Sequence, residues 1–155
     1  MKRILFIIVL TLFGFASQAQ EYTNSLGVRG TYAFGITGKH FFKQNRALEG
    51  ILSFGYGGYN LTGLYEIHAP AFDVERLFWY YGGGAHIGQI HNTHPVYSDM
   101  DDGDILIGFD GIIGLEYDIE EIPITISADW KPTLNLTGYG SGFWGGLSFR
   151  YTFPQ

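Results

Sequence analysis

The chain has 155 residues, of which 46% are apolar, 17% aromatic and 15% charged, with 23 glycines and no cysteine. This length indicates one domain, and the many aromatic residues and few charges exclude an intrinsically disordered chain. The formal net charge of −6 argues against a nucleic-acid partner, because proteins that bind nucleic acid carry basic patches.

The first 19 residues predict a secretory signal peptide. A basic start is followed by an almost wholly apolar run at residues 4–15, and Ser17 and Ala19 place small residues before a cleavage site. The run is short for a transmembrane helix, which needs about 20 residues, although an uncleaved anchor is the alternative. We expect residues 1–19 to be removed and residues 20–155 to form the domain. Without cysteine, an exported domain must depend on packing, hydrogen bonding or a lipid solvent.

The rest of the chain alternates apolar and polar residues at period two, with breaks at Gly, Asn, Asp and Pro. The last segment is the clearest, because its aromatic and aliphatic side chains share one face while Ser148 and Arg150 share the other. Separation of the first two segments at residues 33–35 makes the strand count even, as in bacterial membrane barrels. The eight expected strands are residues 25–31, 36–42, 47–56, 59–69, 77–88, 104–119, 122–132 and 142–153.

Two architectures fit this alternation. A soluble barrel points its apolar face inward, whereas a membrane barrel points that face toward lipid and lines its interior with polar residues. Aromatic residues near strand ends, and a polar face rich in Gly, Ser and Thr, favour the membrane barrel. Since backbone groups in lipid all need partners, the sheet must close. We therefore predict an all-β fold, an eight-stranded antiparallel transmembrane β-barrel. The connections 91–103 and 133–141 would lie outside the cell, and the turns 43–46, 70–76 and 120–121 in the periplasm.

The polar face carries the candidate functional residues. An eight-stranded barrel is just wide enough for side chains to fill it, and a buried ion without a partner costs several kcal/mol. We expect the cations of this face to form ion pairs with its acids and to plug the barrel, and a narrow gated ion path is the alternative. This interior charge network comprises Arg29, Lys39, Glu49, Glu66, His68, His86, Asp110, Glu116, Asp118, Asp129, Lys131 and Arg150.

Catalytic residues are not predicted. His68 and His86 lie on neighbouring expected strands, with Ser53 or Ser148 as conceivable nucleophiles of a lipid-modifying enzyme. However, the nucleophile-elbow pattern GxSxG is absent. The glycines at 82–84 lack the Lys-Ser/Thr of a phosphate loop and are more typical of a tightly curved strand.

Metal and cofactor sites are not predicted either. Clustered carboxylates suit calcium, but the acidic residues of the long connection do not match the spacing of an EF-hand loop. We interpret them as a solvated loop, and two nearby histidines as unligated. These residues are His91, His94, Asp99, Asp101, Asp102 and Asp104.

The final strand GLSFRYTF, with Phe153 near its end, resembles the C-terminal strand of Gram-negative outer-membrane proteins, although Pro154 and Gln155 follow it. With the signal peptide and eight alternating segments, the chain resembles the small OmpA/OmpX-like barrels. The segments AFGITGKHFF, ALEGILSF, LTGLYEIHAPAF and WYYGGGAHIG resemble small outer-membrane proteins of Bacteroidetes-type bacteria.

This resemblance implies a location in the cell outer membrane and two partners. Outer-membrane lipid would surround the barrel, and the barrel assembly machinery would recognise the strand that ends at Phe153. A structural or interaction role in the envelope follows, without a cofactor or catalysis. The alternatives are a lipid-modifying enzyme, a narrow channel and a soluble periplasmic lipocalin-like binder.

Overall fold

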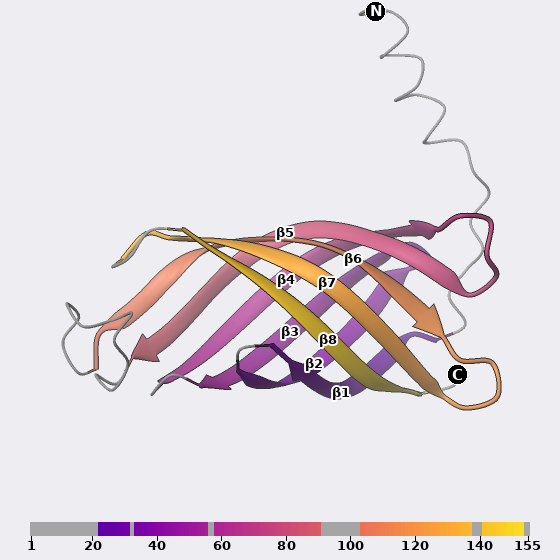
Figure 1. Cartoon of the computed structure of the whole chain (residues 1–155), viewed down its shortest axis with the longest axis horizontal. Helices are drawn as coiled ribbons and strands as arrows, with labels where there is room; N and C mark the ends of the chain where they lie inside the picture. The colour runs from indigo at the N-terminus through magenta and orange to yellow at the C-terminus, as the bar shows by residue number, and fades with distance from the viewer. Residues whose placement is uncertain (1–21, 32, 56–57, 91–102, 138–140, 154–155) are drawn as a thin grey trace, which may run out of the picture.

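The computed structural model describes residues 22–155 except 32, 56–57, 91–102, 138–140 and 154–155. Consecutive strands pair antiparallel, and β1 also pairs with β8, so the sheet closes into a barrel (Figure 1). The predicted eight-stranded antiparallel barrel is therefore confirmed. Among the described residues, no helix is long and apolar enough to cross a membrane. The strands are β1 (Asn24–Gly30), β2 (Phe34–Lys43), β3 (Arg46–Gly55), β4 (Gly58–Pro70), β5 (Leu77–Ile90), β6 (Ile105–Asp118), β7 (Ile124–Asn135) and β8 (Ser141–Phe153).

The two ends of the barrel differ in their connections. Short connections at 44–45, 71–76 and 119–123 join strands at one end, where β1 begins and β8 finishes (Figure 1). We call this the turn end, and the opposite end the loop end. The predicted break between the first two strands is present, because β1 stops at Gly30 and β2 starts at Phe34.

The seventh strand differs from the expected range 122–132, since it runs from Ile124 to Asn135. The expected range ends at Pro132, which instead lies inside the strand. Proline lacks the N–H that a ladder needs, and the pairing of β6 with β7 is interrupted at residues 131–132. Gly111 of β6 lies beside this proline, and a Cβ there would come within 3.1 Å of the Pro132 ring.

Most apolar side chains point outward and most polar side chains point inward. Leu147 on the outer face of β8 is 55% exposed, whereas Arg150 on its inner face is 0% exposed. Several exposed aromatic residues lie near the two ends of the barrel, where membrane barrels carry their girdles, whereas Tyr65, Trp130 and Phe149 lie nearer the middle of their strands. Phe34, Phe54, Tyr59 and Phe143 lie near the loop end, and Phe42, Trp79, Tyr117, Tyr151 and Phe153 near the turn end.

The glycine run in β5 marks a close approach between strands. A Cβ on Gly84 would lie 1.8 Å from the backbone oxygen of Gly63 in β4, and one on Gly82 would lie 1.9 Å from that of Tyr65. Since no side chain fits at these distances, β4 and β5 can pair here only with glycine. This packing supports the strand interpretation of residues 82–84.

Candidate functional site

Five charged side chains from five strands meet inside the barrel. They are Lys39 of β2, Glu49 of β3, Glu66 of β4, Glu116 of β6 and Arg150 of β8, and each side chain is 0% exposed. We call this group the central cluster. Lys39 Nζ lies 2.8 Å from Glu66 Oε2, 3.0 Å from Glu116 Oε2 and 3.5 Å from Glu49 Oε2. Arg150 bridges two acids, with Nη2 2.7 Å from Glu49 Oε1 and Nη1 2.8 Å from Glu116 Oε2.

Neutral hydroxyl groups add hydrogen bonds to the central cluster. Arg150 donates to Ser127 Oγ at 2.9 Å, and Thr37 donates to Glu49 Oε1. The Lys39 ammonium also lies 4.3 Å from the centre of the Tyr80 ring, a distance at which a cation is attracted to the aromatic face. The cluster is thus held by hydrogen bonds as well as by charge.

Tyr22 reaches this cluster from the segment that precedes β1. Its hydroxyl donates to Glu116 Oε1 at 2.6 Å, and its ring packs edge-on against Phe41 with 5.3 Å between centres. Burial, together with the Glu116 and Asp118 carboxylates, raises the pKa of Tyr22 well above its usual value. The phenol therefore remains a hydrogen-bond donor at neutral pH.

A second ion pair lies beside the central cluster. Both terminal nitrogens of Arg29 donate to the carboxylate of Asp129, and the Tyr80 hydroxyl donates to Asp129 Oδ2 at 3.0 Å. Arg29 also contacts Ser148 Oγ at 3.4 Å. Gly146 leaves room for this guanidinium, because a Cβ there would lie 2.3 Å from Arg29 Nη2. Such bidentate pairs fix the orientation of the two side chains as well as balance their charges.

A third group lies closer to the loop end. Asp110 Oδ1 accepts hydrogen bonds from Lys131 Nζ at 2.6 Å and from the Thr133 hydroxyl at 2.8 Å. Its other oxygen lies 2.8 Å from His86 Nδ1. The Lys131 side chain is 13% exposed, whereas Asp110 and His86 are 0% exposed. Lys131 is therefore the cation of the three groups with most access to solvent.

The two histidines considered for catalysis do not meet. His68 pairs in register with Tyr80 of β5, and His86 lies six residues further along that strand. His68 Nε2 lies 3.0 Å from Glu66 Oε2, and its ring stacks on Tyr80 at 5.1 Å. Ser148, a conceivable nucleophile, contacts Arg29 instead. These contacts do not bring His68, His86 and Ser148 together as the nucleophile and base of a catalytic site.

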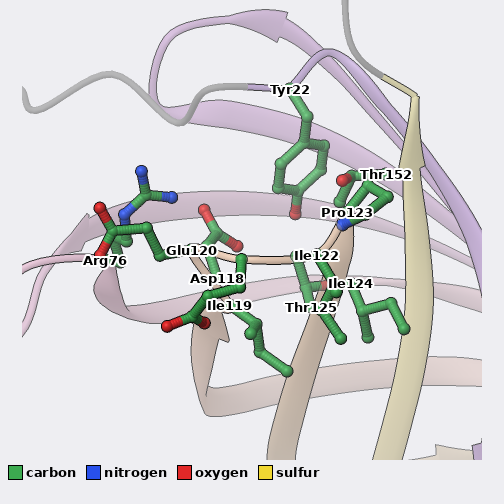
Figure 2. Close-up of a pocket in the computed structure, with 11 residues that line it drawn as sticks. Tyr22, Arg76, Asp118, Ile119, Glu120, Ile122, Pro123, Ile124, Thr125 and Thr152 are labelled. Carbon is green, nitrogen blue, oxygen red and sulfur yellow. The ribbon is translucent and has the colours of Figure 1, made fainter.

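The turn end holds a cavity of about 240 Å³. Figure 2 shows the Tyr22 side chain reaching into it, with Asp118 on one side and Pro123 and Thr152 on the other. Asp118, which was expected in the interior network, is 8% exposed and lines this cavity at the turn end. Apolar side chains fill the barrel further in, where Ile51, Leu64, Tyr80 and Ile112 form one buried cluster.

Within the parts of the chain that the structure describes, no group of three or more His, Asp or Glu residues is placed to hold a metal ion. Of the acidic loop, Asp104 is described and is exposed. His91, His94, Asp99, Asp101 and Asp102 lie outside the described residues.

Sequence reasoning selected the charged residues but missed their neutral partners. Tyr80, Thr37 and Ser127 occupy the polar face, so alternation places them inside, but nothing in the sequence shows which ion each one meets. Tyr22 precedes the first strand and gives no periodic signal.

The barrel is similar to the crystal structure of the N-terminal β-barrel domain of Pseudomonas aeruginosa OprF. The match has a TM-score of 0.67 and 18% sequence identity, and it covers 88% of this chain and 100% of that chain. The fold is that of an outer-membrane β-barrel. The resemblance to OmpA-like barrels is thus confirmed at the level of the fold. No family model matches the sequence, and no curated protein matches it.

Proposed function

We propose that this chain is an integral outer-membrane protein with a structural or interaction role in the cell envelope, and that its barrel is plugged by its own side chains. The observation that supports the proposal is that apolar side chains lie outside and charged side chains inside, the reverse of the arrangement in a soluble protein. Leu147 and other apolar residues cover the outside, whereas the ions of the central cluster are sealed inside. In water this arrangement would expose apolar surface all around the barrel, and in lipid that surface is solvated.

The proposal includes two partners and an orientation. Outer-membrane lipid covers the apolar band, and the barrel assembly machinery recognises β8 through its end at Phe153. The turn end faces the periplasm, in agreement with the short turns of membrane barrels on that side. Residues 1–19 are removed as a signal peptide, residues 20–155 remain, and the chain is one of the small barrels of Bacteroidetes-type bacteria.

Fractionation of the native envelope tests the location. On a sucrose gradient the protein should accompany the outer membrane and need detergent for extraction. The purified barrel should also migrate faster on a gel before heating than after it, since a closed barrel resists unfolding by detergent. Recovery in the soluble periplasmic fraction would instead favour the lipocalin-like binder.

The plug is tested separately from the location. The complete burial of Lys39, Glu49 and Arg150 supports a barrel that does not conduct. In planar bilayers we expect no discrete single-channel currents, and reproducible current steps would overturn the plug.

We also propose that the protein is not an enzyme. The mass of lipid A should therefore be the same in cells with and without the protein, and a mass shift abolished by His86→Ala would contradict this.

A further inference from the structure

The central cluster contains more acid than base. Lys39 and Arg150 supply two positive charges, whereas Glu49, Glu66 and Glu116 supply three carboxyl groups, and all five side chains are 0% exposed. A buried ion without a compensating charge is strongly disfavoured, and in practice such a group takes up a proton. Charge balance therefore calls for one proton in this cluster.

The hydrogen bonds show where that proton fits. Among the described side chains, Glu49 Oε2 and Glu66 Oε1 are buried and accept no hydrogen bond. The two carboxyl groups lie close to one another, because both face the same Lys39 ammonium, with Glu66 Oε2 at 2.8 Å and Glu49 Oε2 at 3.5 Å from Nζ. They come from positions two residues apart in register, because Ala47 pairs with Glu66 and Glu49 pairs with Leu64. Two ionised carboxylates in contact repel, whereas one shared proton turns the contact into a short, strong O–H···O bond.

The surrounding contacts favour Glu66 Oε1 as the atom that carries the proton. Glu66 Oε2 is already occupied, since it accepts from Lys39 at 2.8 Å and lies 3.0 Å from His68 Nε2. Glu49 Oε1 accepts from Arg150 and from Thr37, and Glu49 Oε2 lies 3.5 Å from Lys39. Glu49 therefore faces both cations and keeps its charge.

The other titratable groups around the pair are accounted for. Arg29 and Asp129 balance each other, and Glu116 is balanced by its contacts with Lys39 and Arg150. The remaining candidate for the extra proton is His68, which approaches the same Glu66 oxygen as Lys39. A second cation at that oxygen would be repelled by the first. The groups that face the pair are Lys39 of β2, His68 of β4, Tyr80 of β5, Glu116 of β6, Arg150 of β8 and, through Glu116, Tyr22.

We infer that Glu49 and Glu66 form an acid pair that binds one proton, carried by Glu66 Oε1 and donated to Glu49 Oε2. The barrel interior is thus a proton-binding site, and its electrical neutrality depends on this proton. The inference goes beyond the proposed function, because it depends only on interior contacts. It holds for the folded barrel in detergent as well as in a membrane.

Infrared spectroscopy of the folded full-length protein tests the pair directly. At neutral pH the wild type should show the carbonyl stretching band of a protonated carboxylic acid. Glu66→Gln should abolish this band, because the two remaining acids then balance the two cations. Asp110→Asn, in the separate group near the loop end, should leave it unchanged. Absence of the band in the wild type, or its persistence in Glu66→Gln, would overturn the inference.

Thermal unfolding supplies a second readout. In Glu66→Gln the amide nitrogen can donate to Glu49 Oε2 while the amide oxygen accepts from Lys39 and His68, so the variant should melt no lower than the wild type. In Glu49→Gln an amide nitrogen placed at the Oε2 position would face the Lys39 ammonium, so this variant should melt lower. The reverse order of the two variants would refute the assignment of the proton to Glu66.

The pH profile follows from the same proton. The folded chain holds it, whereas an unfolded carboxyl group releases its proton above about pH 5. Stability then falls as pH rises. Between about pH 5 and about pH 8, the melting temperature of the wild type should drop relative to that of Glu66→Gln. A constant difference across this range would contradict the proton site.

Discussion

Removal of the Arg150 guanidinium is the sharpest test of the interior charge network. Arg150 is 0% exposed and donates to two carboxylates, Glu49 and Glu116, and to the hydroxyls of Ser127 and Thr37. In Arg150→Met the side-chain volume is roughly kept, but the buried acids retain Lys39 as their cation. Breaking a buried ion pair by removing one partner costs about 3–5 kcal/mol.

The proton affinity of the remaining buried acids narrows the range expected for the loss of stability. The variant can restore its charge balance by protonating one more carboxyl group. For an ordinary glutamate at neutral pH this costs about 3.7 kcal/mol, because pH 7 lies about 2.7 units above its usual pKa. We therefore expect Arg150→Met to lose about 3–4 kcal/mol at neutral pH. The loss should shrink by about 2–3 kcal/mol near pH 5, where protonation is cheaper.

Urea unfolding in lipid vesicles, followed by tryptophan fluorescence, measures this loss. Lys131→Met is the control, because Lys131 is also an interior cation, but it pairs with one acid, Asp110, and its side chain is 13% exposed. Its removal should cost less than that of Arg150, because solvent reaches this site and Asp110 keeps the Thr133 hydroxyl and His86 as partners. If Arg150→Met stays within about 1 kcal/mol of the wild type, or if its loss does not change with pH, the interior is not the water-poor charge network described above.

Three further predictions concern the outer face, the glycines and the turn end. Leu147→Arg, at the middle of β8, should weaken insertion into vesicles by about 2–4 kcal/mol, whereas Glu120→Arg in an exposed turn should not. Gly84→Ala should lower stability by about 1–3 kcal/mol, because its Cβ would strike the backbone of β4, whereas a Cβ on Gly63 meets nothing within 4 Å. Tyr22→Phe should lose about 1–3 kcal/mol, since a buried carboxylate oxygen loses its donor. Because the pKa of Tyr22 is raised in the folded chain, the wild type loses stability above about pH 10 and this gap should narrow there.

Each of these predictions has an outcome that contradicts it. Equal insertion of Leu147→Arg and wild type would show that the apolar face does not meet lipid. Equal stability of Gly84→Ala and Gly63→Ala in urea titrations would show that β4 and β5 do not approach as closely as described. A Tyr22→Phe variant with the urea midpoint of the wild type would show that the segment before β1 is not anchored.

The sequence predicts the fold well because each strand of a β-barrel has alternating apolar and polar residues, a pattern that can be recognised locally. A residue on a strand faces one of two sides, so the period-two pattern of β8 places Leu147 and Arg150 on opposite faces without knowledge of any neighbour. The choice of a membrane barrel then places Leu147 outside and Arg150 inside. The expected strands agree with the structure to within a few residues. The largest difference is in β7, where Pro132 reads as a strand end but lies within the strand, since the partner strand β6 tolerates the missing N–H.

The pairing inside the barrel was decided by tertiary structure. Alternation shows that Lys39, Glu66 and Arg150 share an interior, but their partners depend on strand register and on how far each side chain reaches across the lumen. Tyr22 meets Glu116 across 94 positions of sequence, and no local pattern encodes such a contact. Which face a side chain takes is a property of its own strand, whereas which ion it meets is a property of the closed sheet, because closure alone brings β2, β4, β6 and β8 within reach of one another.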